Sequence, residues 1–213
     1  MKVVKGASGF GDAIYMRVIM EWLLKNRPDE YTILTKYPDV FSNLSIKTEN
    51  FNSNHLKIDY NFTYIHNKTS SFSQFEDLIR YGNLSNITLT SDLKNRKLTN
   101  TILVINPYAP MNGGSMATEM KPNLEEYINF VSNYNNIQFI NKKYKFKDLI
   151  DMFNSAKAVI SQVGWAVPLA EMLDVPLIAI FTKRALNSKY QFISTIKPHK
   201  IKTKKTTIIK IME

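Results

Sequence analysis

The sequence predicts an α/β protein whose two lobes each contain a parallel sheet. Short runs of apolar and β-branched residues alternate with helical patterns, which is typical of parallel strands joined by crossover helices. The strands expected at 2–5 and 101–106 each lead into a loop that contains glycine, and the polar stretch 83–100 separates them. We therefore expect an N-terminal lobe at 1–100 and a C-terminal lobe at 101–213, facing each other across a cleft.

The N-terminal lobe begins with a strand, a glycine turn and a helix, an arrangement typical of ligand-binding α/β proteins. The turn spans 6–12, and apolar positions then recur at helical spacing from Ile14 to Leu23. Asn26-Arg27-Pro28 ends this helix. The elements expected next are a strand at 31–35, a short helix or turn at 38–44, strands at 56–60 and 62–66, and an amphipathic helix at 72–81.

The C-terminal lobe continues the alternation. The strand 101–106 leads into a loop at 107–121, and loops of this length in a compact domain are usually functional or mobile. A helix with proline in its first turn follows at 122–134. The other elements expected are a strand at 137–140, a helix at 146–154 and a last strand or extended segment at 206–211.

The stretch 158–181 carries the clearest pattern in the chain. An apolar run, a small polar turn, an apolar helical segment and a second apolar run follow one another, as in a parallel βαβ unit buried on both faces. Ligands bind such units where the strand's carboxyl end meets the helix's amino end, because the free N–H groups there attract anions. Ser161–Trp165 would be that place, and the alternative is a βαβ unit that serves only as core.

Composition indicates a soluble, globular protein. The 213 residues are 44% hydrophobic and 12% aromatic, and no apolar stretch approaches the ~18 residues that a membrane span needs. The first residues lead into a glycine turn, so we expect no secretory signal. The absence of cysteine excludes disulfides and thiolate chemistry and fits a cytoplasmic protein.

The net charge of +10 is compatible with binding to nucleic acid or to another anionic surface. Two other causes compete with this interpretation. Asn, Lys and Ile are abundant throughout, as expected from an AT-rich genome, and the lysines between 197 and 205 fit a solvated tail.

Two stretches together resemble one protein family. Lys5, the turn Gly9-Phe10-Gly11-Asp12, Pro28 and the strand at 31–35 resemble the opening of glycosyltransferase family nine, the ADP-heptose:lipopolysaccharide heptosyltransferase group. The stretch 158–181 resembles the same family's nucleotide-sugar segment. The resemblance implies a GT-B architecture of two Rossmann-like lobes, with the donor held mainly by the second lobe and the acceptor by the first. Because most such transferases are longer, we expect a reduced first lobe, as in a short viral or minimal homologue.

The resemblance also implies a reaction. It implies inverting hexosyl or heptosyl transfer without a metal ion, with a nucleotide-diphosphate sugar as co-substrate and no separate cofactor. Asp12 matches the aspartate proposed as general base on the acceptor hydroxyl, and a carboxylate at a helix amino terminus stays ionised. The alternative is an aspartate that only stabilises the helix start. The other residues expected on the acceptor side are Gly9, Gly11, Tyr15 and Arg17.

The donor side is expected to use residues of the second lobe. Lys121 matches a lysine that meets the diphosphate in the family, although the tryptophan that follows it there is missing here. Trp165 would stack on a base or fill core, and we favour core. The full set expected to bind the donor is Asn112, Gly113, Lys121, Ser161, Gln162, Gly164, Trp165, Lys183 and Arg184.

Departures from the family leave the donor and the retention of catalysis open. The family commonly has Asp-x-Gly followed by a histidine, whereas this chain has Gln162-Val163-Gly164 and then Val167-Pro168. A non-catalytic module that binds a nucleotide or nucleic acid is therefore an alternative. The acceptor is expected to be an anionic glycan or lipid, reached at the inner membrane surface, ahead of DNA with modified bases, and the oligomeric state stays open.

Other chemistries have little support. The opening Gly6-Ala7-Ser8-Gly9-Phe10 resembles NAD-dependent epimerases and dehydrogenases, but Asp12 stands where their third glycine belongs, and a carboxylate there would oppose the cofactor phosphates. Three histidines without cysteine give no zinc spacing, so we expect no metal site.

Overall fold

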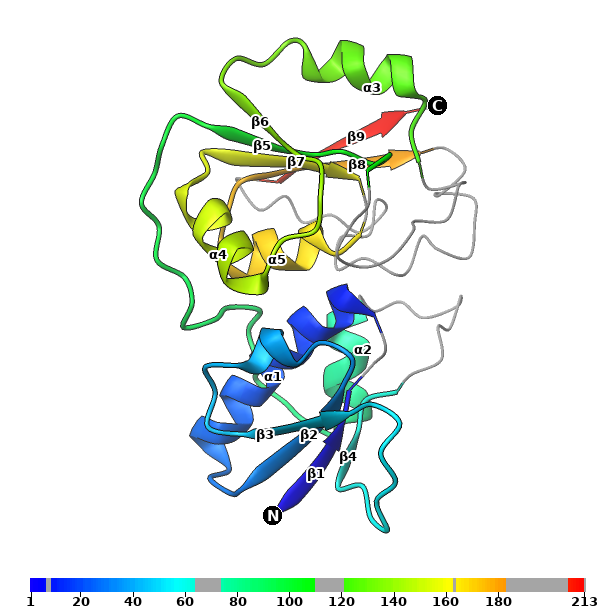
Figure 1. Cartoon of the computed structure of the whole chain (residues 1–213), viewed down its shortest axis with the longest axis vertical. Coiled ribbons are helices and arrows are strands. Elements are labelled where there is room, and N and C mark those ends of the chain that lie inside the picture. The colour runs from blue at the N-terminus through cyan, green and yellow to red at the C-terminus, as the bar shows by residue number, and fades with distance from the viewer. Residues whose placement is uncertain (7–8, 64–73, 110–120, 163, 183–206, 213) are drawn as a thin grey trace.

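The protein folds into two α/β lobes stacked along its long axis (Figure 1). The computed structural model describes residues 1–6, 9–63, 74–109, 121–162, 164–182 and 207–212. Both sheets are entirely parallel, so the α/β class with two parallel-sheet lobes is confirmed. Helices α1, α4 and α5 lie between the two sheets, and α3 lies on the far side of the second sheet (Figure 1).

The first sheet has four strands in the order β3-β2-β1-β4. β1 pairs with β2 so that Lys2 lies opposite Tyr31, and all five residues of β2 are buried. The elements of this lobe are β1 (Lys2–Lys5), α1 (Phe10–Asn26), β2 (Tyr31–Thr35), η1 (Pro38–Phe41), β3 (Lys47–Asn50), β4 (Tyr60–Asn61) and α2 (Gln74–Tyr81).

Two strand predictions in this lobe needed correction. The expected strands at 56–60 and 62–66 reduce to β4, because Leu56 is fully exposed and Phe62 lies just beyond the strand; residues 64–66 lie outside the described part. The segment before β4 is held by side chains instead: Asp59 accepts the Val3 N–H and pairs with Lys57. β3 was missed because its sequence KTEN is polar, which an edge strand paired only to β2 tolerates.

The second sheet has five strands in the order β6-β5-β7-β8-β9. The predicted βαβ unit is confirmed as β7, α5 and β8, and the last predicted strand is β9. The elements of this lobe are β5 (Ile102–Ile105), α3 (Leu124–Val131), β6 (Ile137–Ile140), α4 (Phe146–Ser155), β7 (Ala158–Gln162), α5 (Ala166–Met172), β8 (Leu177–Thr182) and β9 (Thr207–Met212).

Helix α3 begins later than predicted. Its N-cap is Asn123, whose side-chain oxygen accepts the N–H groups of Glu125 and Glu126 at 3.0 and 3.2 Å. Pro122 therefore precedes the cap and does not occupy the first turn. The side-chain cap sets the start of this helix, because it satisfies two N–H groups that have no partner within the helix.

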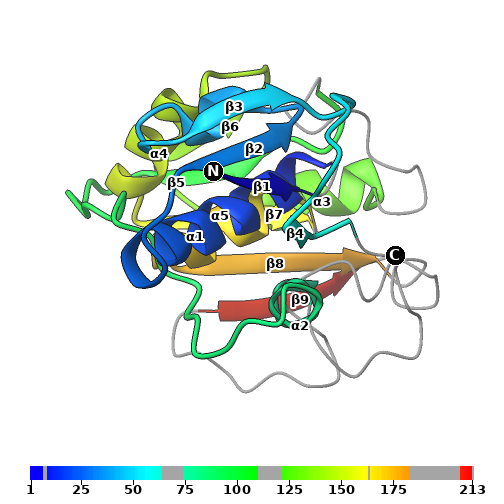
Figure 2. The ribbon, with the colours of Figure 1, turned by 90° about the horizontal axis from the view of Figure 1, so that it is seen from below.

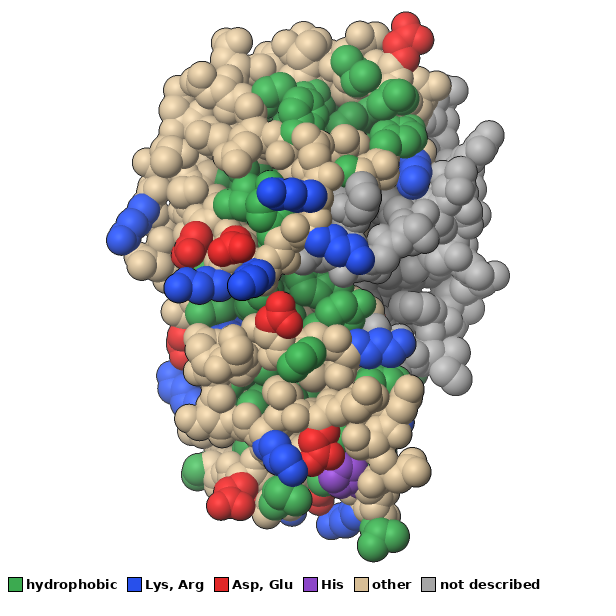
Figure 3. Space-filling view, viewed as in Figure 1, with side chains coloured by type: hydrophobic (Ala, Val, Ile, Leu, Met, Phe, Trp, Pro, Cys, Tyr) green, Lys and Arg blue, Asp and Glu red, His purple; other side chains and the backbone are tan. Residues whose placement is uncertain are grey.

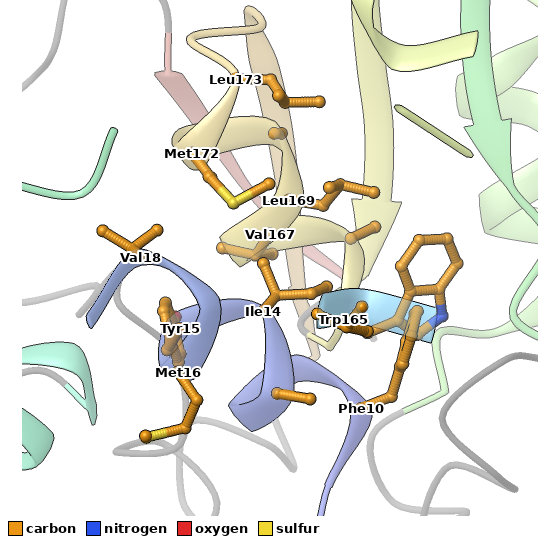
Figure 4. Close-up of a cluster of buried hydrophobic side chains, with 14 of the residues drawn as sticks. Phe10, Ile14, Tyr15, Met16, Val18, Trp165, Val167, Leu169, Met172 and Leu173 are labelled. Atoms are coloured by element: carbon orange, nitrogen blue, oxygen red, sulfur yellow. The ribbon is translucent and has the colours of Figure 1, made fainter. Parts of the chain in front are cut away.

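A shared apolar core joins the two lobes. α1 and α5 lie against each other at the seam (Figures 1 and 2), and most of the buried apolar side chains of both belong to one continuous cluster. Phe10 meets Trp165 edge-on with ring centres 5.6 Å apart, and Ile14 faces Val167 and Leu169 (Figure 4). Along these two helices the expected cleft is therefore filled by side chains.

The central position of α1 explains its sequence. Ten of its 17 residues are buried, including every residue from Ala13 to Met20. A helix that is covered on nearly all sides needs apolar residues around its whole circumference. None of the helices in the described part of the chain is both long and apolar enough to cross a bilayer.

Candidate functional site

The strand order of each sheet marks a position where ligands bind. In open parallel sheets this position lies beyond the carboxyl ends of two neighbouring strands whose connections leave in opposite directions. In the first sheet these strands are β1 and β4, and in the second they are β5 and β7. Gly9 and Asp12 follow β1, and the segment 161–165 spans the end of β7. We call these two positions the first and second switch points, after the sheet in which each lies. Segments expected to hold the acceptor and the donor thus lie at the two switch points.

The start of α1 fixes Asp12 in place. Asp12 is the third residue of the helix, and its Oδ2 accepts the N–H of the N-cap residue Gly9 at 3.0 Å. This is one half of a capping box, since glycine has no side chain to complete the other half. A Cβ on Gly9 would lie 2.6 Å from Oδ2 of Asp12, so a side chain at position 9 would force this carboxylate to rotate away from its present position.

Gly11 brings this helix start against the second lobe. A Cβ at position 11 would lie 3.3 Å from Cα of Trp165 and 3.6 Å from Cγ of Pro168. The absence of a side chain therefore allows the backbones of α1 and the 161–165 segment to approach closely. As a result, Asp12 lies one residue away from the contact with the expected donor segment.

The described residues of the 161–165 segment are mostly buried. Ser161 and Gln162 are 1% and 4% exposed, and the Ser161 hydroxyl donates to the Gln162 carbonyl at 2.7 Å. Trp165 is 8% exposed, and its ring packs against Phe10 and Phe153. Trp165 thus belongs to the core between the lobes, whereas Gly164 is half-buried and closer to solvent.

Lys121 lies beside the carboxyl end of β5. Its Nζ is 5.4 Å from the ring centre of Tyr108, whose hydroxyl donates to the Pro122 carbonyl. The Tyr108 N–H in turn donates to Oδ1 of Asn106 at 2.9 Å. Tyr108 is 43% exposed, so a half-open aromatic ring and a lysine stand together at the second switch point. The sequence analysis missed Tyr108, although an aromatic residue three positions after a buried strand was a usable signal.

Two residues expected on the acceptor side are buried. Tyr15 is 1% exposed and its ring lies 5.5 Å from that of Phe75. Arg17 is also 1% exposed: Nη1 donates to the Val40 carbonyl at 2.5 Å and to Asn43 Oδ1 at 2.7 Å. These side chains support the acceptor side from within and do not line its surface.

The burial of Arg17 is compensated by charge. Nη2 of Arg17 lies 2.9 Å from Oε1 of Glu21, which also accepts the Ser91 hydroxyl at 2.8 Å. Burial lowers the pKa of Arg17, and the carboxylate of Glu21 opposes that shift. The network ties α1 to η1 and to the crossing segment, residues 83–100, which connects the two lobes.

Tyr37 is a further residue near Asp12. Its ring packs edge-on against Phe10 with centres 5.2 Å apart. Burial raises the pKa of Tyr37, and the negative charge of Asp12 raises it further. Tyr37 thus lies within the electrostatic reach of Asp12, and nothing in the sequence pattern indicated it.

A cavity of about 660 Å³ opens at the seam, between η1, the crossing segment 92–97 and α4. Its volume falls within the usual range for small-molecule sites. None of the expected site residues lines it. Acidic and basic side chains gather along this seam (Figure 3), and those that line the cavity are Asp39, Asp92, Lys97, Lys147 and Asp151.

The remaining expected donor residues, Asn112, Gly113, Lys183 and Arg184, lie outside the described residues. Within the ranges that the structure describes, no group of three or more His, Asp or Glu side chains is arranged to hold a metal ion.

No protein-family model and no curated protein matches this sequence. Among solved structures, the fold is similar to that of TibC, a bacterial iron-containing dodecameric glycosyltransferase from enterotoxigenic E. coli H10407, with a TM-score of 0.60 and 9% identity. The likeness covers 91% of this chain and 62% of TibC, so the chain spans less than two thirds of that protein. At this identity the likeness shows the fold, a GT-B-like pair of parallel α/β lobes.

Proposed function

We propose that this protein is a glycosyltransferase that moves a sugar from a nucleotide-diphosphate donor to a glycan or lipopolysaccharide-type acceptor. One observation carries the proposal: the carboxylate of Asp12 is fixed at the start of α1, beside the point where Gly11 contacts the 161–165 segment. A candidate base and a candidate donor segment from opposite lobes thus lie next to each other. The likeness in fold to a glycosyltransferase supports the same class of reaction.

The proposed reaction uses the two lobes separately. Residues 1–100 hold the acceptor and residues 101–213 hold the donor. The acceptor hydroxyl oxygen attacks the anomeric carbon, the bond from that carbon to the diphosphate breaks, and the hydroxyl proton passes to Asp12. In the proposed reaction the attack comes from the face opposite the diphosphate, so the anomeric configuration is inverted. The Gly9 N–H and the amino end of α1 favour the ionised form of Asp12 that a base requires.

The donor diphosphate belongs at the second switch point in this proposal. Lys121 supplies a positive charge beside the end of β5, and Tyr108 offers a half-exposed ring next to it. An ammonium group is a common partner of phosphate, and an aromatic ring is a common partner of a nucleobase. The backbone of the 161–165 segment forms the other side of this switch point.

Ligand binding is the first test. Melting temperatures are measured with nucleoside diphosphates, nucleotide sugars and NAD, since a ligand that binds the folded state raises the melting temperature by mass action. We expect one nucleoside diphosphate and its sugar to raise it and NAD to have no effect. A shift with NAD alone, or no shift with any nucleotide, would overturn the proposal.

Turnover is the second test. With the donor so identified, release of the nucleoside diphosphate is followed with phosphorylated glycans, lipid-linked glycans and modified DNA. Asp12→Asn should bind the donor as the wild type does and slow transfer by about a hundredfold or more, because general base catalysis contributes about 10²–10⁴-fold. Donor binding without transfer to any acceptor would instead indicate a non-catalytic nucleotide-binding module.

A further inference from the structure

Three neighbouring strands of the first sheet each place one side chain at the same edge. Lys5 is the last residue of β1, Lys36 directly follows β2, and Phe51 directly follows β3. The strands are parallel and adjacent in the order β3-β2-β1, so their carboxyl ends form one edge. β1 runs from the N-terminus toward the second lobe (Figure 1), which puts this edge on the side of the sheet that faces the seam.

The two lysines converge on one aromatic ring. Nζ of Lys5 lies 5.1 Å from the ring centre of Phe51, and Nζ of Lys36 lies 5.4 Å from the same centre. Cation–π attraction favours each position separately. Each ammonium group is positively charged, so two positive charges lie within 5.4 Å of the same ring centre at the sheet edge and raise the local positive potential.

The lysines at the opposite edge of the sheet behave differently. Lys2, at the start of β1, lies 3.6 Å from Asp59, and Lys57 lies 3.1 Å from the same carboxylate. Within the described ranges, neither Lys5 nor Lys36 forms an ion pair with a carboxylate. Positive charge is therefore neutralised at the amino ends of the strands and left available at their carboxyl ends.

Lys36 is followed in the chain by a residue that lies close to the candidate base. Tyr37, the residue after Lys36, packs against Phe10 and has its pKa raised by burial and then by the charge of Asp12. The edge that carries the lysines is thus continuous with the start of α1.

We propose that Lys5 and Lys36, with the Phe51 ring that both approach, form an oxyanion-binding site for a phosphate or carboxylate group. Resting on the proposed function, this group belongs to the sugar acceptor and orients its hydroxyl toward Asp12. Lysine binds phosphate as a point charge without a fixed fork geometry, so the pair accepts either oxyanion. The occupancy of the site by an oxyanion does not depend on catalysis.

Inorganic phosphate and acetate test the site directly. Each is titrated into ¹⁵N-labelled full-length protein, and the amide shifts of Lys36 and Phe51 are followed. Lys5→Gln/Lys36→Gln removes both charges, and Lys25→Gln/Lys143→Gln removes two charges from exposed positions elsewhere. We expect the shifts in the wild type and in the control. We expect at least about tenfold weaker binding in the double variant, because hydrogen bonds to charged groups are among the stronger ones.

The outcomes separate cleanly. If Lys5→Gln/Lys36→Gln binds phosphate and acetate as tightly as Lys25→Gln/Lys143→Gln does, the proposed site is refuted. It is also refuted if the amide shifts are confined to other parts of the protein. Tighter binding of phosphate than of acetate indicates that the ligand carries a phosphate group, and tighter binding of acetate indicates a carboxylate. Phe51→Leu keeps an apolar side chain but removes the aromatic ring. It should weaken oxyanion binding less than Lys5→Gln/Lys36→Gln does, and its melting temperature should stay close to that of the wild type.

Transfer assays then distinguish this inference from the proposed function. Loss of both lysines should raise KM for an anionic acceptor and leave kcat and the KM of an uncharged acceptor unchanged. Oxyanion binding without any sugar transfer would leave the site in place and refute the transferase. Transfer with unchanged KM for the anionic acceptor in Lys5→Gln/Lys36→Gln would refute the role of this site in acceptor binding.

Discussion

Replacing Gly11 with alanine should loosen the contact between the two lobes. The added Cβ would lie 3.3 Å from Cα of Trp165, closer than the ~3.5–4.0 Å at which carbon atoms pack favourably. Because the neighbour is a backbone atom, no side-chain rotation relieves the contact, and α1 or α5 has to move by a few tenths of an ångström. The same movement shifts Asp12 relative to the 161–165 segment.

The magnitude follows from two opposing effects. Glycine to alanine within a helix normally stabilises by about 0.5–1 kcal/mol, whereas overpacking a core costs about 1–3 kcal/mol. We therefore expect Gly11→Ala to lower the free energy of unfolding by about 1 kcal/mol, which corresponds to a decrease of about 2–4 °C in melting temperature for a chain of this size. Urea unfolding and thermal unfolding both measure it.

Gly6→Ala is the matched control. A Cβ on Gly6 would lie 3.5 Å from Cγ of Met16 and 3.7 Å from the Leu34 carbonyl, which are ordinary contacts, and the φ of Gly6 is outside the left-handed region. This variant should change the free energy of unfolding by no more than about 0.5 kcal/mol. If Gly11→Ala proves as stable as the wild type or more stable, the close approach of α1 to α5 is refuted.

Three further predictions concern polar groups. Arg17→Gln should lower the free energy of unfolding by about 3 kcal/mol in urea, since it leaves Glu21 without its charge partner; Arg17→Gln/Glu21→Gln should recover part of the loss, and no recovery would count against the ion pair. Tyr127→Phe should cost about 1 kcal/mol, because the buried hydroxyl donates to the Ile105 carbonyl at 2.7 Å, and an unchanged unfolding midpoint would contradict that bond. The pKa of Asp59 is lowered by a backbone hydrogen bond and by lysine, so its stabilisation is present above the unfolded pKa and is lost as pH falls through the folded pKa. Unfolding of Asp59→Asn measured from pH 6 to 2 should therefore show a smaller loss of stability on acidification, and a pH profile parallel to that of the wild type would refute this.

Local elements were largely predictable because their signals are local. The apolar run at 31–35 forms the buried parallel strand β2. The stretch 158–181 forms the buried parallel strands β7 and β8 with helix α5 between them, as expected for strands covered on both faces. The polar strand β3 was not predictable, because it forms only by pairing with β2. Pattern methods detect burial, and an edge strand has little of it.

The candidate site was only partly predictable. The Gly9 and Asp12 pairing follows from their spacing in the turn, since a carboxylate three residues beyond the N-cap reaches back to the cap N–H. The burial of Tyr15 and Arg17 did not follow, because it depends on contacts with residues far along the chain: Phe75 packs against Tyr15, and Val40 and Asn43 accept hydrogen bonds from Arg17. The run from Ala13 to Met20, which is apolar apart from Arg17, was the available signal.

The sequence by itself determined the alternation of strands and helices and the position of Asp12 at a helix start. These features arise from neighbours within a few residues, whose conformational preferences the chain carries locally. Only the tertiary structure decided that α1 meets α5 at Gly11 and that Lys5, Lys36 and Phe51 share one edge. These contacts depend on strand order and on packing between lobes, which join residues far apart in the chain and leave no periodic trace in the sequence.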